Sequence, residues 1–211
     1  QGSRIIPQEV LPPLFDSVWG YRHKARLGVR YVPKKQRVLV GFREKDQRFL
    51  ADLNCCEILE PRVGQRLGKL QNLVNALSAK AEIAQIEVAV SEAVVALIFR
   101  NLTDLIEDDL RKLKEFAQTE NFHVFLQPNR PQPLHRLWPE NTNDFLTYHL
   151  PTQGLSLDFH PLHFTQIHQA LNVKMIDQAL ALLAPTSEDQ ILDLFCGLGN
   201  FSLPLAKYAK N

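Results

Sequence analysis

The chain has 211 residues, 45% of them hydrophobic, and its 24 basic and 23 acidic side chains leave a net charge of only +1. This length can bury a core, which predicts two small domains or one domain and part of another. No apolar run approaches the roughly 20 residues of a membrane span, and no secretory leader opens the chain. Three cysteines, two of them adjacent, do not make a disulfide framework. We therefore expect a cytoplasmic protein that contacts no membrane.

Residues 1–20 are expected to be a linker, because three prolines interrupt any periodic pattern between Ile5 and Val18. The stretch that follows is strongly basic, with ten lysines and arginines against two acids between Tyr21 and Phe49. Four of the basic side chains occupy even positions of a period-2 pattern, so on a strand they would share one face. These four are Arg22, Lys24, Arg26 and Arg30.

A turn at residues 33–36 and two further strands, 37–42 and 49–53, would complete an antiparallel meander with a basic face. A row of positive charges suits the phosphate backbone of RNA, because each neutralised phosphate releases counterions whatever the base sequence. The alternative is a solvent-facing side of the sheet that is kept charged to prevent edge association. Arg22, Lys24, Arg26 and Arg30 are thus the candidate RNA contacts.

The pattern after the meander predicts alternating helices and strands, which make residues 21–159 an α+β central domain with an antiparallel sheet and helices. A proline-rich loop is expected between Pro128 and Pro139. The expected elements are a helix Gln65–Ala79, strands Ile83–Val90 and Ala93–Phe99, a helix capped by Thr103 or Asp104 and ending at Glu120, and strands Phe122–Leu126, Asp144–Leu150 and Leu155–Phe159.

The segment after His160 is expected to run into a helix that ends at Leu183. Apolar residues recur there at every fourth position, which predicts one buried stripe. The stripe consists of Ile167, Leu171, Met175, Ala179 and Leu183. Histidines 160, 163 and 168 have no carboxylate or cysteine at ligand spacing, so a metal site is not expected among them.

The last segment joins a short apolar run, Ile191–Phe195, to a Gly-x-Gly turn and a helical pattern, as when a buried parallel strand enters a nucleotide-binding βα unit. Gly197 and Gly199 would let the backbone approach a ligand, and Asp193 and Asn200 would hold polar parts of a nucleoside. On its own, Gly-x-Gly is equally typical of an ordinary turn between a strand and a helix.

The residues around these glycines are more specific. Asp193-Leu-Phe-Cys-Gly-x-Gly-Asn-Phe201 resembles the first motif of S-adenosylmethionine-dependent methyltransferases, and in particular of the RNA uracil-C5 methyltransferases. A dinucleotide dehydrogenase would need a third glycine, and this register has Phe201 and Ser202 instead. The resemblance implies that residues 160–211 begin an α/β, Rossmann-like methyltransferase domain.

The resemblance also assigns residues to the cofactor, S-adenosyl-L-methionine. Gln166 stands where the family has the glutamine that contacts the methionine portion, although His168 replaces the usual asparagine two positions later. The implied cofactor-binding set is Gln166, Asp193, Phe195, Gly197, Gly199 and Asn200.

Cys56 is similar to the last of four thiolates on a [4Fe–4S] cluster in the ribosomal RNA branch of the family, with Glu57 in place of the usual proline. The three upstream cysteines of that site are not in this sequence. One remaining thiolate beside Cys55 cannot supply a four-thiolate cubane, so the cluster is expected in a longer parent protein but not in this chain.

The resemblance implies methyl transfer to C5 of a uridine in 23S ribosomal RNA. In this family a cysteine thiolate adds to C6 of the uracil, and a base later removes the C5 proton. The family places both groups beyond its glycine motif, and Cys196 is interpreted as a structural residue. We therefore expect no catalytic residue in this chain, which would be an inactive fragment of the enzyme, and its apolar segment after Ile191 would favour self-association. The alternatives are a transfer RNA uracil-C5 methyltransferase and a non-catalytic RNA-binding module with a methyltransferase remnant.

Overall fold

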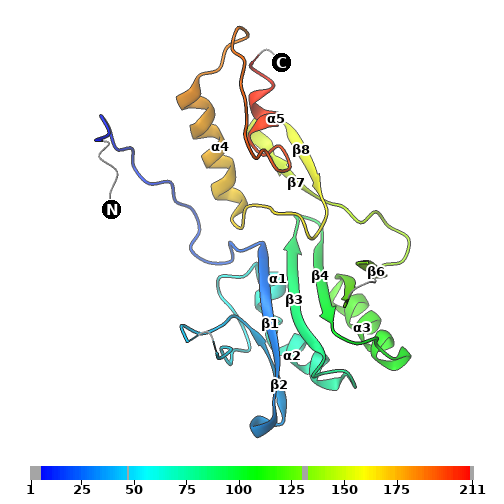
Figure 1. Cartoon of the computed structure of the whole chain (residues 1–211). Helices are drawn as coiled ribbons and strands as arrows, with labels where there is room; N and C mark the ends of the chain where they lie inside the picture. Colours follow the sequence, from blue (N-terminus) through cyan, green and yellow to red (C-terminus); the bar gives the residue numbers. More distant parts are fainter. Residues whose placement is uncertain (1–5, 47, 130–132, 210–211) are drawn as a thin grey trace.

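The computed structural model describes residues 6–46, 48–129 and 133–209. The described residues form a six-stranded mixed sheet in the order β2-β1-β3-β4-β5-β6 and a separate two-stranded sheet, β7-β8 (Figure 1). The strands are β1 Lys24–Val32, β2 Arg37–Gly41, β3 Ile83–Val90, β4 Val95–Asn101, β5 His123–Pro128, β6 His135–Trp138, β7 Leu146–Leu150 and β8 Leu155–Phe159. The α-helices are α1 Pro61–Gly64, α2 Leu67–Ala76, α3 Glu107–Glu120, α4 Gln169–Leu183 and α5 Ser202–Leu205.

Strands β1 and β2 form the predicted hairpin. Residues 33–35 make a 3-10 turn, and Gln36 closes it in the left-handed conformation with a φ of 49°. Along β1, Ala25 and Leu27 are buried while Lys24 and Arg26 lie on the other face, so the predicted alternation of β1 is confirmed.

The predicted third strand of the meander, Phe49–Leu53, is wrong. This part of the chain makes one isolated bridge, between Arg43 and Leu50, and then turns across the hairpin. A Cβ built on Gly28 would lie 2.7 Å from a methyl carbon of Leu50. The side chain of Leu50 therefore lies directly over Gly28, so this segment covers the hairpin instead of extending it. The other edge of β1 pairs with β3.

Helix α2 confirms the predicted amphipathic helix, with Leu67, Leu70 and Val74 fully buried against the sheet. Helix α3 confirms the second one, but it begins at Glu107 and neither Thr103 nor Asp104 caps it. The side chain of Asn101 donates to the carbonyl of Thr103 at 2.9 Å. This hydrogen bond stabilises a turn after β4 and delays the start of the helix.

Helix α3 is fixed at both ends. In its first turn, the buried carboxylate of Asp109 accepts hydrogen bonds from the backbone N–H groups of Ser78 and Ala79, at 2.8 and 3.0 Å. In its last turn, the carboxylate of Glu120 lies 2.5 Å from the side-chain nitrogens of both Arg66 and Lys69. Burial alone would raise the pKa of Glu120, but the hydrogen bonds from Lys69 and Arg66 outweigh it, and this pKa is lowered.

The prediction of an antiparallel central sheet is wrong for one pair of strands, because β4 and β5 run parallel. Helix α3 provides the crossover connection that a parallel pair requires. Part of the predicted loop 128–139 is also a strand, since β6 pairs antiparallel with β5. Prolines restrict the ends of β6, and an edge strand tolerates this restriction because one side needs no ladder partner.

A second apolar core lies on the side of the sheet opposite α2 and α3. It joins small and aromatic residues of β3, β4 and β5 to β7, β8 and α4, which gather above the sheet in Figure 1. Its buried members are Ala89, Ala96, Ile98, Phe125, Leu146, Tyr148, Leu150, Leu157, Phe159 and Ile176. The predicted strands at β7 and β8 are thus confirmed, while a domain boundary at residue 159 stays a prediction.

Helix α4 exists as predicted, but its buried stripe does not. The buried side chains are Asn172 and Ile176, whereas Leu183 at the end of the predicted stripe is 61% exposed. A strict four-residue repeat advances about 40° around a helix of 3.6 residues per turn at each step, so the predicted stripe winds away from the core. None of the described helices is long and apolar enough to cross a membrane.

The predicted strand at residues 191–195 is also wrong. These residues have no strand structure, and the side chains of Leu192, Leu194 and Phe195 are 80%, 69% and 102% exposed. An apolar run becomes a strand only where a neighbouring strand pairs with its backbone. The described part of the chain provides no such ladder beside this segment.

Candidate cofactor pocket and nucleic-acid interface

The glycine turn at residues 196–199 lines a pocket of about 460 Å³, a volume typical of small-ligand sites. Three separate parts of the chain build it: Tyr148 from β7, the segment that precedes α4, and the turn itself. The lining residues are Tyr148, His163, Phe164, Thr165, Gln166, Phe195, Cys196, Gly197, Leu198, Asn200 and Phe201.

The structure brings together four of the six predicted cofactor residues in this wall, namely Gln166, Phe195, Gly197 and Asn200. Asp193 and Gly199 are not part of it. The carboxylate of Asp193 instead accepts a hydrogen bond of 2.6 Å from the hydroxyl of Ser202, at the start of α5. Gly199 supports the turn with its positive φ of 84° and with an N–H that donates to the carbonyl of Cys196 at 2.9 Å.

Two aromatic rings are exposed at the pocket. Phe164 is 78% exposed and Phe195 is fully exposed. Phe195 has a φ of 65°, an unusual backbone conformation for a residue other than glycine, and such strain is concentrated at ligand sites. The two rings offer apolar faces to a ligand, while the amides of Gln166 and Asn200 offer hydrogen bonds.

The carboxamide of Asn200 lies in a network of hydrogen bonds. Its oxygen accepts from the hydroxyl of Tyr148 at 3.1 Å and from the amide of Asn172 at 2.9 Å. Its nitrogen donates to the oxygen of Asn172 at 2.8 Å. Burial raises the pKa of Tyr148, so its hydroxyl keeps the proton that it donates.

A second, open hollow of about 400 Å³ adjoins the pocket, and three of its eight lining residues are lysine or arginine. Three of the four predicted RNA contacts line it, and His163 and Phe164 belong to both hollows. We call it the basic cleft; its lining residues are Arg22, Lys24, Ala25, Arg26, Glu87, Leu162, His163 and Phe164. Arg30 lies elsewhere on β1 and donates to the carbonyl of Arg48 at 2.8 Å.

The three basic side chains of the cleft differ in their surroundings. The guanidinium of Arg22 lies 5.5 Å from the ring centre of Phe42, and its Nε is buried without a hydrogen-bond partner among the described residues. Arg26 is well exposed and forms an ion pair of 3.4 Å with Glu87. Lys24 donates to the carbonyl of Pro161. Burial lowers the pKa of Lys24, an effect that the charge of Glu87 partly offsets.

Cys56 is half-buried in the segment between the hairpin and α1, and Cys55 beside it is exposed. Within residues 6–46, 48–129 and 133–209, no group of three or more histidine, cysteine, aspartate or glutamate side chains could hold a metal ion. The thiolates present do not fit a cubane, which requires four, so Cys56 as an iron ligand stays a prediction.

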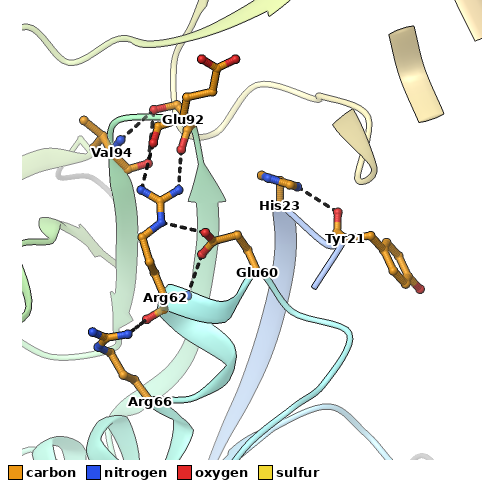
Figure 2. Close-up of polar contacts among 8 residues, drawn as sticks. Tyr21, His23, Glu60, Arg62, Arg66, Glu92 and Val94 are labelled. Carbon is orange, nitrogen blue, oxygen red and sulfur yellow. Dashed lines mark hydrogen bonds and ion pairs between the residues drawn. The ribbon is translucent and has the colours of Figure 1, made fainter. Parts of the chain in front are cut away.

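Polar contacts fix the segment after Cys56 against the sheet, as Figure 2 shows. The carboxylate of Glu60 accepts from the backbone N–H of Arg62 at 2.9 Å, which caps α1, and from the guanidinium of Arg62 at 2.7 Å. The same guanidinium donates to the carbonyls of Ser91 at 2.7 Å and Glu92 at 3.2 Å. Arg62 therefore ties this segment to the β3–β4 turn.

A cleft with three basic side chains beside a pocket at a glycine turn, with aromatic and amide walls, is an arrangement typical of proteins that bind a nucleoside cofactor next to a polyanion. Residues 18–211 match the family described as tRNA (Uracil-5-)-methyltransferase, and the chain belongs to this family.

Its curated relatives include three bacterial proteins named 23S rRNA (uracil(1939)-C(5))-methyltransferase RlmD. The one from Hahella chejuensis is 46% identical over 203 residues, which cover 96% of this chain and 46% of the relative. The one from Xanthomonas campestris pv. campestris is 47% identical over 205 residues, which cover 97% and 46%. The one from Francisella tularensis subsp. novicida is 44% identical over 212 residues, which cover 99% and 47%. The chain thus spans about half the length of the curated relatives it matches.

The fold is similar to that of a solved structure, the Pyrococcus abyssi tRNA (uracil-54, C5)-methyltransferase in complex with S-adenosyl-L-homocysteine. The TM-score is 0.65 at 16% sequence identity, over 90% of this chain and 47% of that chain. At this level of identity the likeness establishes a shared fold.

Several contributors to the site were not among the predicted site residues, and Tyr148 and Asn172 are the two that hold Asn200. Tyr148 lies in a strand whose alternation predicts only its burial, and nothing in the sequence connects it to a turn 52 residues away. The sequence could have indicated Asn172, because a polar residue on the buried side of a helix needs a hydrogen-bond partner.

Proposed function

We propose that the natural protein containing this chain transfers a methyl group from S-adenosyl-L-methionine to C5 of a uridine in 23S ribosomal RNA. The observation that carries this proposal is the match of residues 18–211 to the methyltransferase family. The pocket supports it, because Gln166, from the segment before α4, meets Phe195 and Asn200, from the glycine turn, in one wall. The relatives at 44–47% identity are named for 23S rRNA, which favours ribosomal over transfer RNA.

The residues of the pocket fit the cofactor. When bound, S-adenosyl-L-methionine supplies an electrophilic methyl group on a sulfonium. The amides of Gln166 and Asn200 would hold its polar groups, and the rings of Phe164 and Phe195 would lie against its adenine or its sulfonium cation. Gly197 lines the wall with no side chain of its own, and a Cβ built there meets nothing within 4 Å.

The target uridine requires chemistry of its own, because C5 of an aromatic pyrimidine is a poor nucleophile. In the proposed reaction a cysteine thiolate adds to C6, C5 attacks the methyl group, and a base removes the C5 proton before the thiolate leaves. Cys196 lies in the wall of the pocket, and its exposed thiol is 3.9 Å from the carbonyl of Gly197. We assign Cys196 to the cofactor turn and expect the nucleophile elsewhere in the natural protein.

The basic cleft is the proposed path of the RNA backbone. Arg22, Lys24 and Arg26 line it, and His163 and Phe164 connect it to the cofactor pocket. A phosphate bound near Arg26 would therefore place the adjoining nucleotide close to the methyl donor. Flipping the target base out of its stack would bring its C5 into reach.

Further parts of the proposal concern the natural protein as a whole. We propose that it acts in the cytoplasm and that Cys56 contributes one thiolate to a [4Fe–4S] cluster whose other ligands lie outside these residues.

We also propose that residues 1–211 alone self-associate through the exposed apolar side chains of Leu192 and Leu194. Light scattering of the isolated chain tests the last point, since a monomer would contradict it.

The decisive experiment measures transfer of radioactive methyl groups from S-adenosyl-L-methionine by the natural protein to 23S rRNA and to bulk tRNA. Methylation of 23S rRNA at C5 of a uridine is expected, and Cys196→Ala should keep most of it. Methylation of tRNA alone would assign the substrate to the other branch of the family. If neither RNA is methylated although both bind, the protein is an RNA-binding module and the proposal fails.

A further inference from the structure

Two residues that the proposed function does not use hold the side chain of Asn200. The hydroxyl of Tyr148 donates to the carboxamide oxygen at 3.1 Å. Asn172 and Asn200 form a reciprocal amide pair, with N···O distances of 2.9 and 2.8 Å. Tyr148 lies at the centre of β7 and Asn172 in the first turns of α4, so the network joins both elements to the glycine turn.

Burial makes this network sensitive to change. Tyr148 is 7% exposed and Asn172 is 5% exposed. A buried polar group that has lost its partner is destabilised by the full free energy of its desolvation. Removing any of the three hydrogen bonds is therefore costly. Flipping one of the two amides alone would set donor against donor and acceptor against acceptor. The pair therefore fixes the orientation of both carboxamides together.

This arrangement leaves one donor of Asn200 available. Its oxygen already accepts two hydrogen bonds, and one Nδ2 hydrogen is used by Asn172. Among the described residues no acceptor takes the second Nδ2 hydrogen, and Asn200 lines the cofactor pocket. A ligand oxygen that accepts this hydrogen would find it already oriented, at little entropic cost.

We propose that Tyr148 and Asn172 are positioning residues, which lock the carboxamide of Asn200 so that its remaining N–H is presented to an acceptor oxygen of the bound cofactor. This inference rests on the proposed function. It assigns a role in cofactor binding to a strand outside the methyltransferase-like segment, since Tyr148 precedes residue 160.

The test compares Tyr148→Phe and Asn172→Asp with wild type in the natural protein. Tyr148→Phe keeps the volume and removes one hydrogen bond, so the Kd for S-adenosyl-L-homocysteine and the KM for S-adenosyl-L-methionine should rise between about 2-fold and about 10-fold. Asn172→Asp sets a carboxylate oxygen against the oxygen of Asn200 and should raise both by more than about 10-fold. The kcat at saturating cofactor should not change, because Asn200 binds ground state and transition state alike.

The matched control is Tyr31→Phe. Tyr31 lies on β1 against the other core, and its hydroxyl has no hydrogen-bond partner among the described residues. This variant removes the same atom and should change neither Kd nor KM. A second readout does not depend on catalysis: in NMR spectra of the natural protein, Tyr148→Phe should accelerate hydrogen exchange of the Asn200 side-chain amide.

The outcomes separate the two proposals. If wild type binds S-adenosyl-L-homocysteine but Tyr148→Phe changes neither its Kd nor the exchange of the Asn200 amide, only the positioning role fails. A lower kcat at unchanged KM would also overturn it, since that result points to loss of folded enzyme. If wild type binds no S-adenosyl-L-homocysteine, the proposed function fails and the positioning role falls with it.

Discussion

Replacing Glu87 by glutamine is expected to tighten RNA binding. Glu87 is the acidic residue in the wall of the basic cleft, where its carboxylate pairs with Arg26 at 3.4 Å and its charge also acts on Lys24. A phosphate held by Arg26 would share that guanidinium with Glu87 and be repelled by it. Removing the negative charge while keeping the shape of the side chain should therefore favour the RNA.

The geometry sets the size of the effect. The carboxylate of Glu87 lies 3.4 Å from the guanidinium of Arg26, and a phosphate oxygen bound to the same guanidinium would lie about 2.8 Å from it. The carboxylate and the phosphate would therefore lie about 6 Å apart. Their repulsion is then about 0.7 kcal/mol at the dielectric constant of water and about 2.8 kcal/mol at an effective value of 20. Arg26 is 69% exposed but Glu87 only 13%, so the repulsion lies between these two figures. The lower figure corresponds to about 3-fold tighter binding, which is the smallest effect expected at low salt.

The assay is fluorescence anisotropy with a labelled fragment of 23S rRNA, at neutral pH and several salt concentrations. Neutral pH matters because Glu87 holds up the pKa of Lys24, which its loss would lower further. The control is Glu115→Gln, which removes an exposed acid paired with Arg111 at 2.5 Å on α3 and changes the net charge equally. If both variants tighten binding to the same extent, the effect is one of net charge and the cleft is not the RNA path. If Glu87→Gln weakens binding, the reasoning is wrong.

Two further predictions concern stability. Gly64→Ala would drive a methyl group into the backbone carbonyl of Cys56 and should destabilise the fold by roughly 1–3 kcal/mol in urea denaturation; Gly68→Ala, whose nearest neighbour is 3.6 Å away, should not. The pKa of Glu120 is lowered because hydrogen bonds from its basic neighbours, including Lys69, outweigh its burial. Its contribution to stability is therefore present above the ordinary glutamate pKa and is lost as the pH falls through the lowered value. Wild type should lose more stability than Glu120→Gln between about pH 6 and about pH 3, and parallel losses would contradict this account.

Local sequence patterns correctly predicted the helices and strands that bury only one of their faces. The alternation in β1 and the apolar stripe of α2 match the structure because the buried side chains of both elements pack into one core. The same patterns cannot report a partner that is distant in the sequence. Nothing in the proline-rich loop indicated that β6 would pair with β5, or that Leu50 would cover Gly28 instead of extending a strand.

The candidate site was predictable to the extent that a family motif carries it. Gln166, Phe195 and Asn200 were assigned by resemblance, and the structure brings them to one pocket. The resemblance could not indicate Tyr148, because a strand pattern specifies only that this side chain is buried. Nor could it supply neighbours for the apolar run 191–195, whose hydrophobicity predicted a strand that the described residues do not form.

The register of the central sheet explains how the basic cleft and the second core come to adjoin. Residues directly opposite each other on antiparallel strands point to the same face, and Lys24 pairs with Ala89 while Arg26 pairs with Glu87. Ala89 belongs to the second core, on which β7 and α4 pack and from which Tyr148 reaches Asn200. The charged end of this sheet face thus lines the proposed RNA path. Its apolar end packs against the second core, which adjoins the proposed cofactor pocket. A change in the β1–β3 register by one residue would move Lys24 and Arg26 to the opposite face. Strand pairing in this sheet therefore sets the distance between the proposed RNA path and the proposed cofactor pocket.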